Sequence, residues 1–365
     1  MTQPFLTSDL VGTGGVLRAC DDDFVVEEVP AYEPSGAGDH VFVQVEKRGL
    51  TTPQAVLAIA RALRIRDRDI GVAGMKDRHA VTTQWLSLPP PVTPEAALAL
   101  VLDGIRIRKA TRHGHKLRTG HVRANRFRLR VRGVSAGAAA RARAILDRLA
   151  TAPGAPNWFG EQRFGRGGDN AARGRELVTG VRSLGRDRRL DRLMVSALQS
   201  ELFNGWLRAR IEDGLYRCVI AGDVVHKRAG ETGGGGMFAS TDPETDTARL
   251  IAGEVVPTGP MFGDTMRRPA DGTIAAERED AILEASGLTR DVFTRVKAIA
   301  EGTRRDAAIA VADVAVAEAD DATIEVAFTL PGGAYATAVM RELMKTRDEP
   351  APASAEAVDE TPEPS

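Results

Sequence analysis

Alternating polar and apolar residues, the pattern of a half-buried strand, occur near both ends of this chain. They run through residues 24–29 and 41–45 and return at 307–317 and 323–330. The middle differs, because apolar residues at helical spacing extend over about 190–211. This return of the strand pattern predicts one sheet domain built from both ends of the chain, with the middle as an insertion. The hairpin-like spacing favours a largely antiparallel sheet and the α+β class over a doubly wound one.

The length supports a division into two domains. The chain has 365 residues, of which 43% are hydrophobic and 27% charged, which is ordinary for a globular protein with a sizeable core. Residues 347–365 are rich in Pro, Ala and acids, so we expect a disordered acidic tail there. The first residues lack a basic region followed by an apolar run, and no apolar stretch approaches the roughly 18 residues of a membrane span. Cys20 and Cys218 have no metal-ligand neighbours, which fits a reducing, cytoplasmic location.

The formal net charge of −1 hides a strong local asymmetry. Residues 106–132 carry eleven Lys or Arg and no acid, and residues 163–192 carry nine Arg against four acids. Local fields, more than the sum, steer a polyanion to a surface. A solvated strand face normally mixes both signs, so eleven cations in one stretch are expected to repel one another unless an anion binds. The charge pattern therefore indicates a nucleic-acid partner.

The segment 74–83, with the sequence GMKDRHAVTT, places four charged or titratable residues between two apolar strands. One interpretation is an ordinary solvated hairpin turn. The other is a chemical site, because Asp77 lies between Lys76 and Arg78, and neighbouring cations favour the ionised carboxylate of a nucleophile or base. The segment holds no second carboxylate, so a hydrolase with paired acid and base is not indicated.

Other motifs exclude kinds of site rather than assign a function. His113, His115 and His121 have Arg and Lys neighbours that would repel a metal cation, so no metal site is expected. The glycine runs lack the residues of a phosphate-binding loop or a dinucleotide fingerprint, so no cofactor is expected. Aromatic rings beside basic residues, such as Phe24 and Phe127, suit the stacking of unpaired RNA bases. Because Phe127 alternates with arginines along its strand, we expect it to face inward.

Seven segments, in order, resemble the tRNA pseudouridine synthase D (TruD) family. They are DDDFVVEEV, PSGAGDHVFVQVEKRGLTT, AGMKDRHAVTTQW, ANRFRL, NWFGEQRFGRGGDN, SALQSELFNGW and FTLPGGAYATAVMREL. The resemblance extends over about residues 12–345. The resemblance implies a pseudouridine-synthase domain with a mixed, largely antiparallel sheet, formed by residues 1–154 and 312–346. It also implies an inserted α/β TRUD domain at 155–311.

The resemblance further implies isomerisation of uridine to pseudouridine in tRNA, at uridine-13 of the D arm, without a cofactor. The partner is then tRNA, and the chain is expected to act as a monomer with no obligate protein partner. The catalytic aspartate of the family falls on Asp77. Its substrate-contacting positions fall on Phe24, Asn125, Phe127 and Tyr335, the last being Phe in the family pattern. A basic residue before the first block, frequently Lys in the family, is here Arg18.

The residues leave the reaction at the ribose open. Asp77 either attacks C1′ or removes the 2′ proton to give a glycal. Two other functions use the same features: a non-catalytic tRNA-binding or folding protein would need only the basic face, and a hydrolytic N-glycosidase would release free uracil. The first function predicts that Asp77 is dispensable. A product assay distinguishes the second function from a synthase, because only the N-glycosidase releases free uracil.

Overall fold

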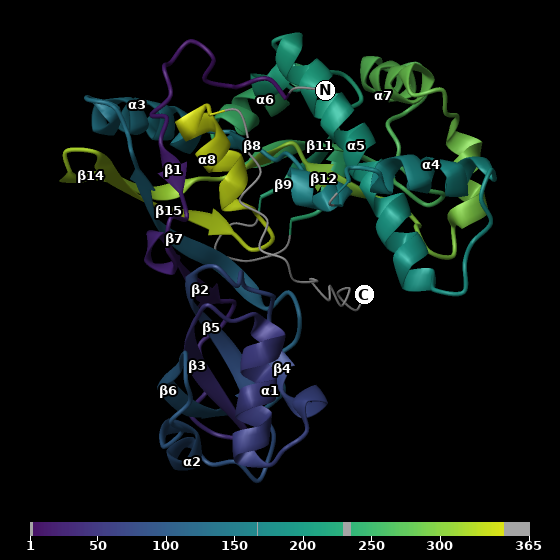
Figure 1. The fold of residues 1–365 in the computed structure, drawn as a ribbon. Helices are drawn as coiled ribbons and strands as arrows, with labels where there is room; N and C mark the ends of the chain where they lie inside the picture. Colours follow the sequence, from purple (N-terminus) through teal and green to yellow (C-terminus); the bar gives the residue numbers. More distant parts are fainter. Residues whose placement is uncertain (1–2, 166, 229–234, 347–365) are drawn as a thin grey trace. The chain divides into compact units, whose positions relative to one another are not determined.

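The computed structural model describes residues 3–165, 167–228 and 235–346, and its contacts divide the chain into two compact units (Figure 1). The first, called the sheet unit here, comprises residues 10–148 and 311–346. The second, called the insert unit, comprises residues 3–9 and 149–310. Among the described residues, none of the helices combines the length and the hydrophobicity that a membrane span requires.

The sheet unit is built on one nine-stranded sheet with the main order β14-β15-β7-β2-β5-β3-β6. Strands β2 and β5 run parallel, and the other pairs are antiparallel. This mixed, largely antiparallel sheet confirms the predicted α+β class. Its strands are β1 (Val16–Leu17), β2 (Phe24–Pro30), β3 (His40–Arg48), β4 (Gly71–Val72), β5 (Val81–Leu88), β6 (Ile105–His113), β7 (Val122–Arg132), β14 (Ala312–Asp320) and β15 (Thr323–Pro331).

Strand β7 joins the two ends of the chain, because it pairs with β2 on one side and with β15 on the other. Its register sets Phe127 opposite Val26 and Phe328. Side chains alternate across a strand, so Phe127 is buried while Arg126 and Arg128 are exposed. The predicted inward direction of Phe127 is confirmed.

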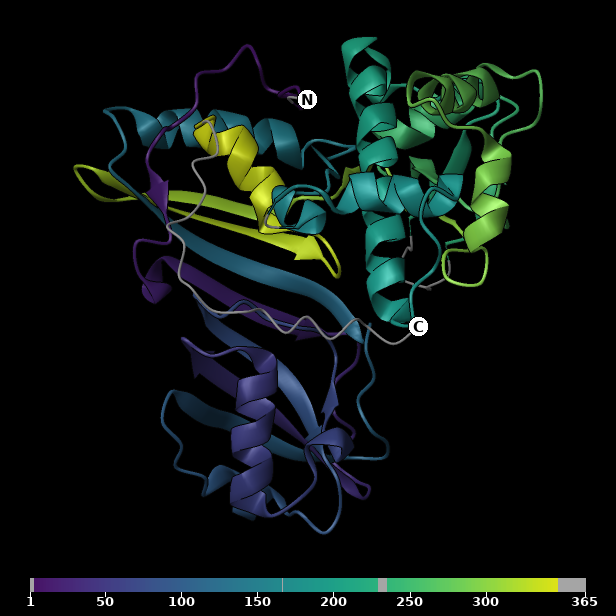
Figure 2. The ribbon, with the colours of Figure 1, turned by 45° about the vertical axis from the view of Figure 1, so that its right-hand side comes forward.

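Four helices complete the sheet unit: α1 (Thr52–Leu63), α2 (Pro94–Leu98), α3 (Ala138–Ala150) and α8 (Ala336–Met344). Thr51 caps α1 by accepting the Gln54 N–H, and Pro53 follows in the first turn; a threonine shortly before a proline is a sequence signal for the start of a helix. The apolar face of α1 packs with valines of β3 and leucines of β5 in one buried cluster. Helices α3 and α8 lie along the same side of β7 and β15 (Figures 1 and 2).

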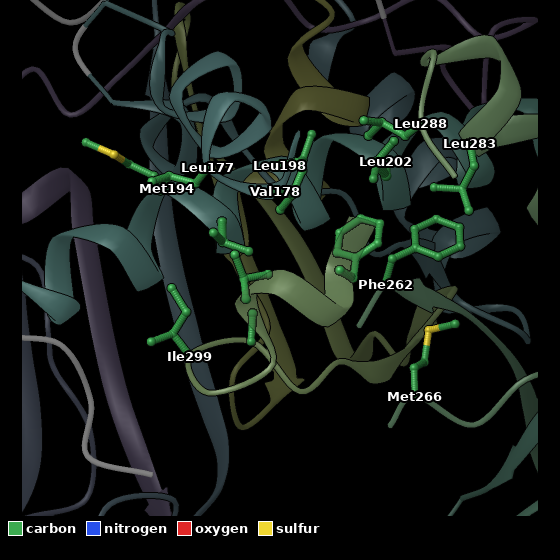
Figure 3. Packing of buried hydrophobic residues seen from close by; sticks show 14 residues of the cluster. Leu177, Val178, Met194, Leu198, Leu202, Phe262, Met266, Leu283, Leu288 and Ile299 are labelled. Carbon is green, nitrogen blue, oxygen red and sulfur yellow. The ribbon is translucent and has the colours of Figure 1, made fainter. Parts of the chain in front are cut away.

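The insert unit combines helices with a four-stranded sheet of order β10-β9-β11-β12 and a short pair, β8 with β13. Its core includes Leu198, Phe262 and Met266 (Figure 3). The helices are α4 (Asn170–Thr179), α5 (Arg188–Glu212), α6 (Pro243–Ile251) and α7 (Ile274–Ala285). The strands are β8 (Ala155–Pro156), β9 (Val224–Lys227), β10 (Met237–Ala239), β11 (Val255–Met261), β12 (Thr303–Asp306) and β13 (Ala308–Ile309).

One expected strand is divided. The pattern at 307–317 predicts a continuous strand, but β13 pairs with β8 of the insert unit and β14 pairs with β15 of the sheet unit. The chain changes partners between Ile309 and Ala312, and Asp313 has a left-handed backbone with φ of 51°. Alternation alone does not show a change of sheet, because both halves keep the same period.

Candidate active site

Asp77 lies in the connection between β4 and β5. These strands pair with each other through Gly71 opposite Ser87 and Val72 opposite Leu86. The carboxylate of Asp77 points outward and is 51% exposed, whereas its backbone carbonyl accepts a hydrogen bond from the buried Lys47 ammonium at 2.7 Å. The backbone is thus held from inside while the carboxylate stays available to a ligand.

Buried polar side chains tether the residue before Asp77. The backbone N–H of Lys76 donates to Thr52 Oγ1 at 2.9 Å, and that hydroxyl donates in turn to Gln84. The Lys76 ammonium forms a buried ion pair with Glu28 at 2.7 Å. Glu28 also accepts the Trp85 backbone N–H through its other oxygen. The connection that carries Asp77 is therefore anchored to β2, β5 and the start of α1, although residues 73–80 form no strand themselves.

Arg18 covers the exposed side of the site. Its guanidinium donates to the Asp77 carboxylate at 2.7 Å and lies over the Phe24 ring, 3.9 Å from the centroid. Arg18 also has a left-handed backbone with φ of 64°, which is uncommon for a residue with a side chain. The charge pairing and the cation–π contact both favour this placement. The structure thus brings Arg18, Phe24 and Asp77 together.

Three phenylalanines form an apolar floor under Arg18, which joins this floor to Asp77. Phe24 packs edge-on against Phe127 with ring centroids 6.3 Å apart, and Phe127 lies 5.5 Å from Phe328. Phe24 is 2% exposed and Phe127 8% exposed. Phe328 was not among the predicted site residues. Its signal was present, because the alternation of 323–330 places it on the buried face of its strand.

Asn125 lies on the same face of β7 as Phe127, two residues away, and pairs in register with Glu28 of β2. Its side chain is nearly buried, and the Oδ1 oxygen has no hydrogen-bond partner in the described chain. A buried acceptor without a partner costs free energy unless a ligand supplies a donor. Asn125 therefore offers an acceptor for a polar ligand at the edge of the phenylalanine floor.

Tyr335 stands apart from this group. It follows the turn after β15 and lies at the N-cap of α8, where its side chain is 53% exposed. Within the described residues its ring forms no aromatic pair. The turn itself is fixed by Gly332, since a Cβ there would lie 2.5 Å from the Val122 carbonyl oxygen. Tyr335 is thus held at the end of the sheet that also carries Asn125, because Pro331 pairs with Ala124.

The cations of residues 106–132 are less isolated than their sequence indicates. Acids on neighbouring strands or turns pair with four of them: Arg108 with Glu46, Arg126 with Glu27, Arg130 with Glu325 and Arg132 with Asp23. The Arg132 hydrogen bonds hold the pKa of Asp23 below its ordinary value. The expectation of uncompensated repulsion was wrong for these arginines, because pairing of strands brings in acids from distant sequence. Exposed cations without an ion pair in the described chain remain at Arg106, Lys109, Arg112, Arg118, Arg123 and Arg128, of which Arg112 donates to the Gly38 carbonyl.

His113 and His115 form a hydrogen-bonded chain, whereas His121 contacts the Tyr32 hydroxyl. Ser35 N–H donates to His113 Nδ1 at 3.2 Å, and His113 Nε2 lies 3.2 Å from His115 Nε2. Burial lowers the pKa of His113. Within the described residues, no group of three or more His, Cys, Asp or Glu side chains is arranged to hold a metal ion.

Comparison with known proteins gives one family. The model of the tRNA pseudouridine synthase D (TruD) family matches residues 2–183 and 172–343. A protein of Anaeromyxobacter dehalogenans (strain 2CP-C), named tRNA pseudouridine synthase D, is 52% identical over 347 residues, covering 94% of this chain and 96% of its own. One of the same name from Thermus thermophilus is 40% identical over 361 residues, covering 97% of both chains.

A solved structure from Methanosarcina mazei, described under the same family name, superposes with a TM-score of 0.80. It is 23% identical and covers 94% of this chain and 96% of its own. At that identity the likeness supports the fold, and the closer relatives carry the assignment. From the family match and these relatives, the chain belongs to the tRNA pseudouridine synthase D family.

Proposed function

We propose that this chain is a tRNA pseudouridine synthase that isomerises uridine-13 of the D arm, with Asp77 as the catalytic carboxylate. The observation that carries the proposal is the grouping of Asp77, Arg18 and Phe24 at family-matched positions, with an ionic contact of 2.7 Å and a stacking contact of 3.9 Å. Such a group supplies a carboxylate for the ribose beside an apolar surface for a base. The sheet unit is then the catalytic domain, and the insert unit is the family-specific domain.

The proposed reaction breaks the N1–C1′ bond of the nucleotide, turns the uracil, and joins C5 to C1′. C5 loses its proton and N1 gains one, so atoms and electrons balance within the nucleotide and the isomerisation calls for no redox partner. The base must first leave its stack in the folded RNA, which costs a few kcal/mol. Asp77 then acts at the ribose, either at C1′ or at the 2′ proton.

Access to the floor requires a movement of Arg18. Phe24 lies beneath the guanidinium, so a uracil can stack there only after Arg18 swings away. The pair between Arg18 and Asp77 is partly exposed, and ion pairs of this kind contribute only about 0–1 kcal/mol. We propose that the entering nucleotide displaces Arg18 at little cost. Phe127 then packs against the base, the unpartnered Asn125 Oδ1 accepts its N3–H, and Tyr335 borders the entry.

A product assay tests the function directly. Purified protein is incubated with tRNA transcripts, pseudouridine is mapped by carbodiimide-blocked primer extension, and free uracil is measured in the same reactions. We expect one new stop at position 13 and no uracil. Free uracil would instead show a hydrolytic N-glycosidase, and tight binding without either product would show a tRNA-binding protein.

The arginines of residues 163–192, which we propose contact the RNA, differ in whether they already have partners within the fold. Several are used within the fold: Arg163 donates to Ser196 and Ser200, Arg173 pairs with Asp169, Arg175 with Glu201, and Arg192 donates to the Ile299 carbonyl. Arg166 lies outside the described residues. Four exposed arginines without an ion pair in the described chain remain in the connection from α4 to α5 and its first turn: Arg182, Arg186, Arg188 and Arg189.

These four arginines, called the α4–α5 arginines here, fit a phosphate-binding surface better than a structural role. Two of them occupy the first turn of α5, where the positive end of the helix dipole disfavours cations. A bound phosphate backbone would relieve that repulsion. We propose that they contact the tRNA backbone and carry no sequence information.

Replacing the α4–α5 arginines by Gln should weaken tRNA binding and flatten its salt dependence. The slope of log K against log salt should fall by about 0.9 for each duplex phosphate that is no longer neutralised. Filter binding over a range of salt concentrations measures both, and kcat at saturating tRNA should stay unchanged. The control has the same net charge and replaces four arginines that are already ion-paired: Arg66, Arg143, Arg249 and Arg268. An equal salt slope in both variants would contradict the proposal.

A further inference from the structure

Lys47 is a buried lysine beneath the Asp77 connection. It lies in β3, opposite Thr82 of β5, and is 1% exposed. Its ammonium donates to three backbone carbonyl oxygens: Leu50 at 2.5 Å, Asp77 at 2.7 Å and Lys76 at 3.4 Å. An ammonium has three N–H donors, so every donor of Lys47 faces a carbonyl oxygen. Two of those oxygens belong to the Asp77 connection, and the third belongs to the segment that leads into α1.

We infer that Lys47 is a positioning residue that fixes the backbone at Asp77 and thereby aims the Asp77 carboxylate at the ribose. This inference rests on the proposed catalytic role of Asp77. The carbonyl and the side chain leave the same backbone, so a carbonyl held inward keeps the carboxylate pointing outward. Thr52 and Glu28 tether the neighbouring Lys76, whereas Lys47 binds Asp77 itself. Misplacing a reacting group by about 1 Å can cost on the order of 10² in rate.

Burial of this ammonium is costly for folding, which argues against a purely structural role. None of its three hydrogen-bond partners is a carboxylate, and a buried charge without a paired counter-ion is strongly disfavoured. The charged groups around it are Asp77, Lys76 and Asp21. Burial lowers the pKa of Lys47 from 10.5 to about 8; Asp77 opposes this shift, Lys76 adds to it, and Asp21 opposes it.

The direction of this shift separates positioning from stability. In the unfolded chain the pKa of Lys47 is 10.5, so the side chain keeps its proton up to about that pH. In the folded chain the pKa is about 8, so the proton is released near pH 8. Between these pH values the unfolded state binds more protons, so rising pH stabilises the fold with respect to this group. Activity should move the other way, because the ammonium loses its charge and one of its three donors. A fall in kcat above pH 8 without unfolding is therefore expected.

Two substitutions test the inference on the full chain. Lys47→Met keeps the length of the side chain but removes every donor, and should lower kcat by about 10²-fold with the tRNA Kd unchanged. Its remaining kcat should also not show the fall above pH 8 that we attribute to Lys47. Lys47→Arg keeps a cation that does not titrate, so it should lack the same step whatever its absolute rate. The uracil of the substrate titrates equally for all variants, so the comparison between variants isolates Lys47.

The controls make each outcome decisive. Thermal unfolding at each pH selects folded protein, and Lys297→Met, an exposed lysine of the insert unit, should match the wild type. A folded Lys47→Met with wild-type kcat and pH profile would overturn the inference. If Lys47→Met does not fold, a Lys47→Arg profile identical to the wild type overturns it. Asp77→Asn is assayed in parallel: if it stays active, the proposed catalytic role of Asp77 fails, and if it alone is inactive, only the role of Lys47 fails.

Discussion

Asp77→Asn should abolish pseudouridine formation and leave tRNA binding intact. Asparagine has nearly the same shape as aspartate, and the Asp77 backbone is held independently by Lys47, so the connection should keep its structure. The amide cannot supply the negative charge needed at C1′ or remove the 2′ proton. We expect kcat to fall by a factor on the order of 10³ or more, as for the loss of an essential base or nucleophile. Primer extension after carbodiimide treatment and filter binding measure the two properties.

The control for this substitution is Asp69→Asn. Asp69 is also an aspartate near β4, but its ion pair is with Arg66, three residues earlier in the chain, and not with a residue of the Asp77 connection. Surface changes of this kind usually shift stability by no more than about 0.5 kcal/mol, and the activity should match the wild type. Asp77→Asn with wild-type modification would contradict the catalytic assignment, and loss of tRNA binding would show a structural role instead.

Glu28→Gln should cause the largest loss of stability among changes near the site. Glu28 and Lys76 form an ion pair whose two side chains are almost fully buried, and the amide would leave the Lys76 ammonium buried without a counter-ion. Breaking a buried pair on one side costs about 3–5 kcal/mol. Urea unfolding of the full chain, followed by fluorescence, measures the change in the free energy of unfolding. The hydrogen bond from Trp85 N–H can persist, because Gln keeps an oxygen there.

The neighbouring residue gives a matched control. Glu27 is exposed and lies 3.9 Å from Arg126, so Glu27→Gln should change the free energy of unfolding by less than about 1 kcal/mol. The double change Glu28→Gln with Lys76→Met removes the unpaired charge and should recover much of the loss. A Glu28→Gln protein as stable as Glu27→Gln would show that the buried pair contributes little.

Local patterns predicted the parts of the structure that depend on neighbouring residues. Alternation in β7 predicted that Phe127 faces inward, and the Thr51 cap with its following proline predicted the start of α1. The helical spacing of apolar residues over about 278–301 predicts one helix, which the structure does not form. Helix α7 ends at Ala285, Gly287 has φ of 66°, and a separate short helix follows at Arg290–Val296. A glycine just past the last turn commonly ends a helix by adopting a left-handed backbone. Gly287 itself could be read from the sequence.

The contacts that complete the site join residues far apart in the chain, so their sequence signals were weak. Lys47 follows the strand pattern of 41–45, where a lysine before an arginine indicates a solvated end, yet its ammonium is buried under Asp77. Glu46 and Glu325 neutralise arginines of other strands only because the register aligns them. Family resemblance, rather than pattern, placed Arg18 in the site, and its stacking on Phe24 is a property of the fold.

The two-sided character of β7 limits how this strand can evolve. Its buried face carries Asn125 and Phe127 of the proposed pocket, and the exposed face carries Arg126 and Arg128. Inserting or deleting one residue would exchange the two faces along the rest of the strand, since side chains alternate with a period of two. Individual positions can therefore accept substitutions, whereas insertions and deletions within β7 are not tolerated. In a collection of natural variants, gaps should be rare across Val122–Arg132 even where the residues differ.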